Sequence, residues 1–273
     1  MQQSLLFSLS PYVAAARMGA GQALRNRGAL GSNLIVYVTL LIVWAAIFRI
    51  TPVEELGLPG LTTGHLFAYF AVAESIIVGC PGLALFGQLI AEGRLSEGLS
   101  RPCSLVGFTL AWLMGQHFVT TLVLLGVGTI ALPLLDAPTP LGLLAGDGAL
   151  RGLGLALSMT FGIALMGMMT YALGTVEVLG SYSRPLSWMV SKSIYAFGGL
   201  FFPVAFFPPL MREVAMLTPF PSVIFVPGSL MLNPTRAGML EGLLMQLFWL
   251  GVMGLVLAAT HRWVVNKALN EDA

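Results

Sequence analysis

Long apolar blocks alternate with short polar segments along most of the chain. A helix needs about 20 consecutive apolar residues to cross the hydrocarbon core of a bilayer, and a backbone embedded in lipid must satisfy its hydrogen bonds internally. The pattern therefore predicts an all-α integral membrane protein with six transmembrane helices. The expected spans cover residues 33–49, 65–90, 105–132, 152–175, 185–205 and 239–264.

The second expected span is longer than a bilayer core requires and contains Cys80, Pro81 and Gly82 part way along. Proline removes one helical hydrogen bond and its ring clashes with the preceding turn. We therefore expect this span to be kinked at Pro81 and to continue to about Ile90.

Two further segments are apolar but unsuited to spanning. Residues 11–29 alternate small apolar residues with Arg17, Arg25 and Arg27. This spacing predicts a basic amphipathic helix on the cytoplasmic surface of the membrane. Residues 206–234 contain six prolines, which exclude a helix of spanning length. They predict an outer re-entrant segment built from short helices.

Composition agrees with a membrane location and narrows the function. The 273 residues are 57% hydrophobic and 9% charged, against about 25% charged in soluble domains. Residues 1–273 therefore form a single transmembrane domain, and any soluble catalysis has to come from a partner chain. A net charge of +1 without a basic stripe excludes nucleic acid as a partner. Cys80 and Cys103 are expected to be packing residues, and the three histidines suggest no metal site.

Basic residues set the expected orientation. With the N-terminus inside, nine of them fall on the cytoplasmic side and four outside, which the positive-inside rule favours. Both termini are therefore expected in the cytoplasm. The inner set is Arg17, Arg25, Arg27, Arg94, Arg101, Arg184, Lys192, Arg262 and Lys267, and the outer set is Arg49, Arg151, Arg212 and Arg236.

The polar segment at residues 91–104 is the first candidate site. Leu95 and Leu99 are spaced i, i+4, which places them on one face of a short helix. Such a ridge with charged flanks can dock into a groove on a soluble partner. The alternative is a solvated turn stabilised by its own Glu/Arg pairs. The charged residues around the two leucines are Glu92, Arg94, Glu97 and Arg101.

Two stretches of this chain resemble a known family. The run from Ile90 to Pro102 resembles the cytoplasmic segment of permeases in the type-2 class of ABC exporters, most closely the bacterial viologen-exporter-like group. The stretch from Gly198 to Pro227 is similar to that family's fifth-span exit, with Phe207-Pro208 and Thr218-Pro219-Phe220 in matching order. The family often has Leu where this chain has Thr218.

The resemblance implies a permease subunit in a bacterial inner membrane. Residues 91–104 would be its coupling helix, seated on a separate ABC ATPase, with two ATPases and a second permease, identical or divergent, in the complex. The substrate would be hydrophobic or amphiphilic. The chain has no G-x-x-x-x-G-K-[ST] motif, so it is not expected to be an enzyme or to bind a cofactor, and ATP with Mg would bind to the partner.

Two charges inside the expected spans support a different hypothesis. Glu74 lies about nine residues into the second span, where a charge is costly and should face the protein interior. It is either a substrate or proton site or a structural hydrogen-bonding group, with His117 as a candidate partner. Lys192 either snorkels to the cytoplasmic interface or pairs with Glu177. The alternative function is an ATP-independent, ion-coupled carrier or channel that uses Glu74 and Lys192.

Aromatic and methionine side chains complete the candidate substrate path. Phe201, Phe202 and Phe207 lie at the expected outer end, where they suggest an apolar gate or a packed plug rather than an interfacial belt, which would be rich in Trp and Tyr. Met166 lies in the fourth span and is either a packing residue or part of an adaptable apolar surface. Together with Glu74, these four residues are the predicted path.

Overall fold

The computed structural model describes residues 2–50, 62–87, 103–134, 148–176, 183–232 and 235–271. Every regular element in these ranges is a helix. The elements are α1 (Gln2–Arg25), α2 (Arg27–Ile50), α3 (Thr63–Gly79), α6 (Leu105–Leu134), α8 (Gly148–Thr175), α9 (Ser183–Phe197), η3 (Val204–Phe206), α10 (Pro209–Met216), α11 (Phe220–Val223), α12 (Phe225–Ser229) and α13 (Arg236–Glu271).

Four helices of the described ranges are long and apolar enough to cross a bilayer. They run from Arg27 to Ile50, Leu105 to Leu134, Leu150 to Thr175 and Arg236 to Trp263. Their outward faces carry exposed apolar side chains such as those of Ile35, Ile130 and Leu255. Water-facing helices are polar on that side, so the chain is a membrane-embedded, all-α protein.

The second and fifth expected spans form shorter helices than predicted. The helix of the second span stops at Gly79, because Cys80 adopts an extended conformation and Gly82 has a φ of +99°. Pro81 thus ends the helix, and the prediction of a kinked but continuous span was wrong for residues 80–84. The fifth span was expected to reach Ala205, but α9 ends at Phe197. At 1.5 Å per residue, the 17 residues of α3 and 15 of α9 extend about 26 and 22 Å.

Helix α3 occupies the centre of the bundle. It is apolar around its whole circumference and buried along most of its length, and it packs against α2, α6 and α12. A helix that is hydrophobic all round belongs in a protein interior. Its first turn is closed by a capping box, in which the Thr62 hydroxyl accepts from the His65 backbone N–H and the His65 ring accepts from the Thr62 N–H.

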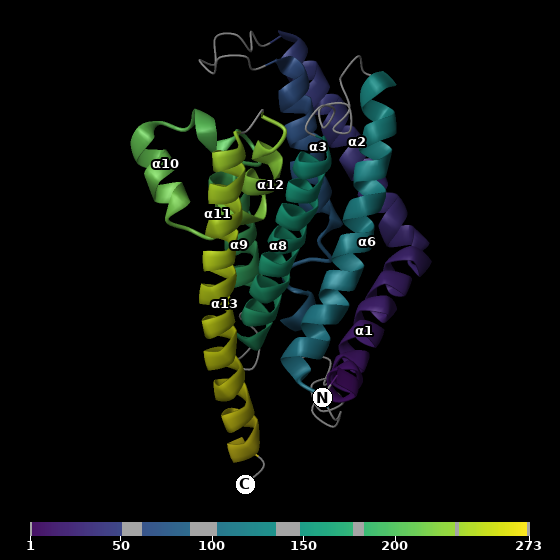
Figure 1. Cartoon of the computed structure of the whole chain (residues 1–273), viewed down its shortest axis with the longest axis vertical. Coiled ribbons are helices and arrows are strands. Elements are labelled where there is room, and N and C mark those ends of the chain that lie inside the picture. The colour runs from purple at the N-terminus through teal and green to yellow at the C-terminus, as the bar shows by residue number, and fades with distance from the viewer. Residues whose placement is uncertain are drawn as a thin grey trace.

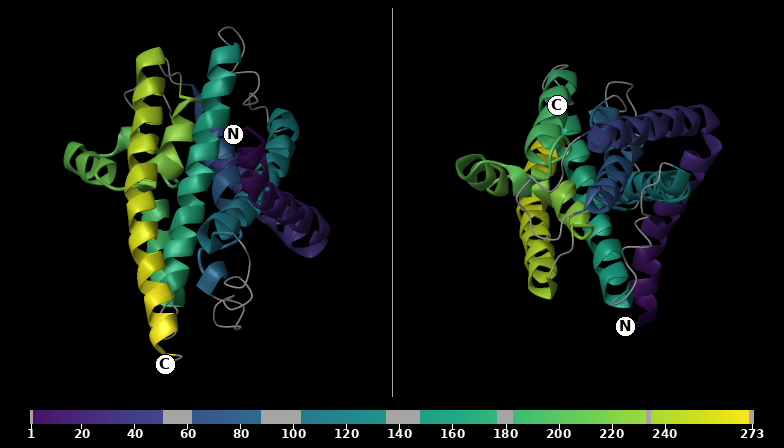
Figure 2. Two further views of the ribbon diagram at one scale, coloured as in Figure 1. Left: turned by 60° about the horizontal axis from the view of Figure 1, so that its bottom comes forward. Right: turned by 90° about the horizontal axis from the view of Figure 1, so that it is seen from above.

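The N-terminal helix packs tightly on α6 (Figures 1 and 2). A Cβ atom on Gly19 would collide with the carbonyl of Trp112, and one on Gly115 with the carbonyl of Ala16. Small residues therefore bring the two backbones together, as in other membrane helix pairs. The predicted amphipathic helix over 11–29 is interrupted at Asn26, where α1 ends and α2 begins.

The proline-rich stretch forms short helices between α9 and α13. The helix α10 projects from the side of the bundle in all three views (Figures 1 and 2). Leu210 on it and Leu217 directly after it are exposed. By contrast, α11 and α12 are buried and pack against α8, with α12 also against α3. The first turn of α1 and the last turn of α13 lie at the same end of the molecule (Figure 1).

Candidate functional site

Glu74 lies in the middle of the core on α3. Its residue surface is 2% exposed, and its carboxylate oxygen Oε1 accepts a hydrogen bond of 3.0 Å from the indole Nε1 of Trp44 on α2. The Trp44 ring stacks on Phe70, with centroids 4.0 Å apart, and contacts Phe48 at 5.7 Å. The carboxylate is therefore held at the edge of an aromatic cluster inside the bundle. Burying it without such a partner would be costly.

His117 on α6 contacts α3 two residues after Glu74 but makes its hydrogen bond to the backbone. Its ring atom Nε2 lies 2.7 Å from the carbonyl oxygen of Ile76. Since a carbonyl oxygen only accepts, the ring donates this bond. The candidate partner His117 was therefore wrong: Trp44 supplies the donor to Glu74, and His117 donates to the backbone of α3.

Two tyrosines tie neighbouring elements to α3. The hydroxyl of Tyr37 on α2 donates to the carbonyl of Ala71 at 3.0 Å, and that of Tyr69 on α3 donates to the carbonyl of Gly199 at 2.7 Å. Gly199 has a φ of +89°, a conformation that residues with a Cβ rarely adopt. The turn after α9 is therefore fixed to the helix that carries Glu74.

The chain leaving α3 is anchored to the end of α8. The ring of Phe86 stacks on Tyr171 with centroids 4.4 Å apart, and Gly174 leaves room for it. The Tyr171 hydroxyl lies 3.1 Å from the Nδ1 atom of His261 on α13. Side chains of α8 and α13 thus form a connected group with Phe86, which lies two residues before the segment 88–102 in the sequence.

The remaining path candidates do not meet in one cavity of the single chain. Met166 is buried in the core on α8, with 3% exposed, whereas Phe201 and Phe202 are 53% and 54% exposed. Phe207 is partly buried beside η3. Glu74 and Met166 are therefore both buried, whereas the rings of Phe201 and Phe202 lie at the surface.

Lys192 lies on the exposed surface of α9. Its ammonium group lies 5.8 Å from the ring centroid of Trp188 and 5.2 Å from that of Tyr195, which are its neighbours along the helix. These distances are in the range of cation–π contacts. Among the described residues, no hydrogen bond or ion pair joins Lys192 to Glu74. Glu177 lies outside the described ranges, as does the candidate coupling ridge with Glu92, Arg94, Leu95, Glu97, Leu99 and Arg101.

A buried amide that the sequence analysis missed joins three elements. Gln246 on α13 is fully buried, and its Nε2 atom donates to the carbonyl of Ser158 on α8 at 2.9 Å and to that of Ser222 on α11 at 2.8 Å. A lone glutamine in the middle of an apolar span was the available signal, because polar groups inside a membrane need partners. This contact holds the short helices of the proline-rich stretch against two long helices.

Comparison of the chain with models of known protein families finds no match, and comparison with curated protein sequences finds none. The functional assignment therefore rests on the residues and geometry of this chain.

Proposed function

We propose that the chain is the permease subunit of an ATP-driven ABC exporter in a bacterial inner membrane, with both termini in the cytoplasm. With a second permease, identical or divergent, it forms the path for a hydrophobic or amphiphilic substrate. Residues 91–104 bind one of two separate ATPase subunits, which bind and hydrolyse ATP with Mg.

The observation that supports this proposal best is the connection between the coupling segment and the core. The segment follows α3 after the break at Cys80–Gly82, and Phe86 of the connection stacks on Tyr171. Movement of the segment is therefore passed to both α3 and α8. Because α3 is packed on several sides, its displacement has to move Glu74 and the aromatic cluster around it.

The distribution of the path candidates fits a path between two permeases. Phe201 and Phe202 expose their rings after the α9 turn, and Tyr69 fixes that turn to α3. Rearrangement of α3 relative to this turn would open or close an apolar gate, and Glu74 and Met166 would become accessible only in the rearranged state. This alternation of states is the mechanism that we propose for export.

The coupling role is tested by changing the predicted apolar ridge. Leu95→Asp or Leu99→Asp places a charge where the ATPase groove would receive a leucine, whereas Ser96→Asp adds the same charge at a polar position. We expect the two leucine variants to lose co-purification with a co-expressed ABC ATPase and to lose stimulation of ATP hydrolysis. The Ser96 variant should retain both. Intact assembly and unchanged ATP turnover in the leucine variants would refute the coupling role.

The ion-coupled carrier remains the second candidate, because Glu74 is an acidic group buried inside the membrane region. The separation of exposed Lys192 from buried Glu74 argues against a working ion pair between them in this state. Reconstitution of the chain alone distinguishes the two functions. Transport driven by a proton gradient in liposomes without an ATPase would support the carrier and refute the exporter.

A further inference from the structure

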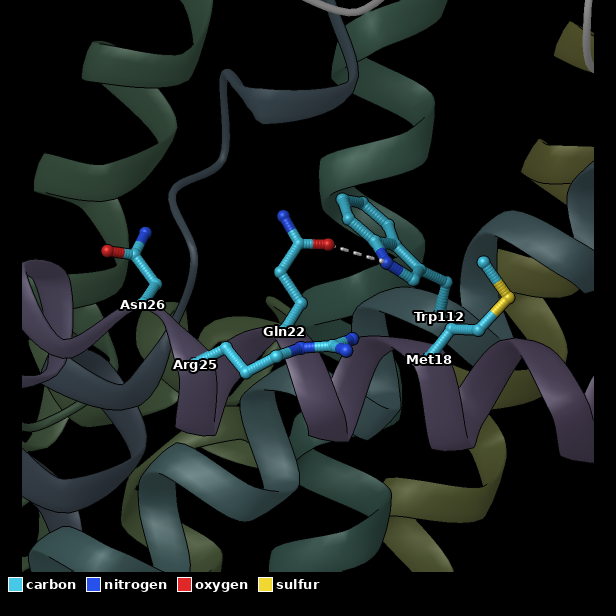
Figure 3. Close-up of a pocket in the computed structure, with 5 residues that line it drawn as sticks. All are labelled: Met18, Gln22, Arg25, Asn26 and Trp112. Atoms are coloured by element: carbon cyan, nitrogen blue, oxygen red, sulfur yellow. Dashed lines mark hydrogen bonds between the residues drawn. The ribbon is translucent and has the colours of Figure 1, made fainter.

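An open pocket lies where α1 ends against α6, on the side chains of Met18, Gln22, Arg25, Asn26 and Trp112 (Figure 3). Its volume is about 450 Å³. The pocket is separate from Glu74 and from the aromatic gate, and the proposed transport function does not use it.

The polar side chains of this pocket leave several hydrogen-bond donors unpaired among the described residues. The indole N–H of Trp112 donates to Oε1 of Gln22 at 3.2 Å, and the backbone N–H of Ala29 donates to Oδ1 of Asn26 at 3.2 Å. Both donors are N–H groups without acceptor capacity, so they fix which amide atom faces them. The NH₂ groups of Gln22 and Asn26 are left for a ligand.

Arg25 adds a positive charge to these donors. Its Nε atom donates to the carbonyl of Gly21 at 3.1 Å, which holds the guanidinium along α1 and leaves the two terminal nitrogens for a ligand. None of α1, α2 and α6 contains Asp or Glu, and no carboxylate pairs with Arg25 in the part of the chain that the structure describes. Several unpaired donors beside a guanidinium without a carboxylate partner suit an anion with several acceptor oxygens, such as a phosphate.

The depth of the pocket places this anion at the level of lipid headgroups. Helix α6 has 30 residues and extends about 45 Å, which exceeds the hydrocarbon core of about 30 Å. Trp112 lies at the start of its third turn, and tryptophan is typical of the membrane interface. The span of α2 begins directly after Asn26, at Arg27. Met18 and the Trp112 ring provide apolar surface beside the polar groups.

We propose that this pocket binds the headgroup of an anionic phospholipid. The phosphate accepts hydrogen bonds from Arg25, Gln22 and Asn26, and the first methylenes of an acyl chain pack on Trp112 and Met18. The site recognises the lipid through its negative charge, so a zwitterionic lipid of the same size binds more weakly.

The test uses the full chain, purified in detergent and stripped of lipid, with fluorescent phosphatidylglycerol and phosphatidylcholine as probes. We expect tighter binding of phosphatidylglycerol, and Arg25→Gln should weaken it about tenfold, which corresponds to one charge-assisted hydrogen bond. Arg17→Gln is the matched control, because Arg17 is exposed on the same helix but does not line the pocket. It should change affinity by less than about twofold, as expected of a surface charge.

Two conservative variants distinguish the loss of ligand-binding donors from a loss of folding. Gln22→Glu keeps an oxygen for the Trp112 N–H, and Asn26→Asp keeps one for the Ala29 N–H, while each replaces an NH₂ donor with a negative acceptor. Both should lose selectivity for phosphatidylglycerol without unfolding. Equal affinity for the two lipids, equal loss in both arginine variants, or displacement of the lipid by equimolar glycerol 3-phosphate would overturn the proposal.

Discussion

The hydrogen bond from Trp44 to Glu74 can be removed while most of the aromatic contact remains. Trp44→Phe deletes the indole N–H that lies 3.0 Å from the carboxylate and keeps a ring to stack on Phe70. The substitution leaves a carboxylate that is 2% exposed without this donor. We expect the free energy of unfolding to fall, because a buried carboxyl oxygen has lost its hydrogen bond.

The magnitude follows from the burial and the partner. Side-chain hydrogen bonds inside membrane proteins contribute about 0.6 kcal/mol on average and up to about 1.7 kcal/mol. Because this acceptor is almost completely buried in the core, we expect a coupling energy between Trp44 and Glu74 near the upper end of this range, about 1.5 kcal/mol.

A double-mutant cycle measures this coupling. Trp44→Phe, Glu74→Leu and the double variant are unfolded reversibly in mixed micelles with increasing denaturing detergent. The loss of ring area in Trp44→Phe occurs in both backgrounds and cancels in the cycle. Trp249→Phe is the matched control, because this partly buried indole on α13 donates to no acceptor among the described residues. Its effect should be the same with Glu74 or Leu at position 74.

A coupling energy below about 0.3 kcal/mol, within the additivity error of independent sites, would refute this reasoning. It would mean that Glu74 is stabilised by other groups and that the aromatic cluster does not hold the carboxylate.

Two further predictions concern packing and the buried amide. Gly19→Ala should destabilise the protein by about 1–3 kcal/mol, because its new Cβ collides with the Trp112 carbonyl. The Cβ of Gly31→Ala on α2 meets nothing within 4 Å, so that variant should stabilise the protein by about 0.5 kcal/mol. Equal thermal shifts of the two variants would contradict the α1–α6 contact. Gln246→Leu should lower the free energy of unfolding by about 1–3 kcal/mol, because it removes two hydrogen bonds. It should also loosen α11, so that a cysteine placed at Val223 reacts faster with a thiol reagent. Leu247→Met on the exposed side of α13 is the control and should leave that reaction rate unchanged.

The sequence was most informative about the long apolar helices. The third expected span, 105–132, differs from α6 by two residues at one end. The prediction was accurate because an unbroken apolar run of that length forms a membrane-spanning helix. The prolines of the 206–234 stretch correctly predicted short helices. Apolar runs and prolines, which act on the local backbone, are therefore enough to predict where the long and the short helices lie.

Tertiary contacts were harder to predict from the sequence than the long helices. The partner of Glu74 proved to be Trp44 rather than His117, because which face of α2 meets α3 depends on helix packing. The two elements that end early, at Gly79 and Phe197, were overestimated because apolar residues continue beyond the helix end. Gln246 carried a signal that was overlooked, since a single polar group in an apolar span needs an interior partner.

The close contact of α1 with α6 has a consequence for how the protein is made. Gly19 meets a surface around Trp112 that leaves the ribosome more than 90 residues later, since the two positions are 93 residues apart. At about 5–20 residues per second, α1 waits roughly 5–20 s for its partner. During that time the α1 surface that is buried in the finished bundle, including Ala15 and Gly19, lacks α6 to cover it. Helix α1 is therefore synthesised before α6 and docks late, and completion of the bundle depends on α6 arriving beside it.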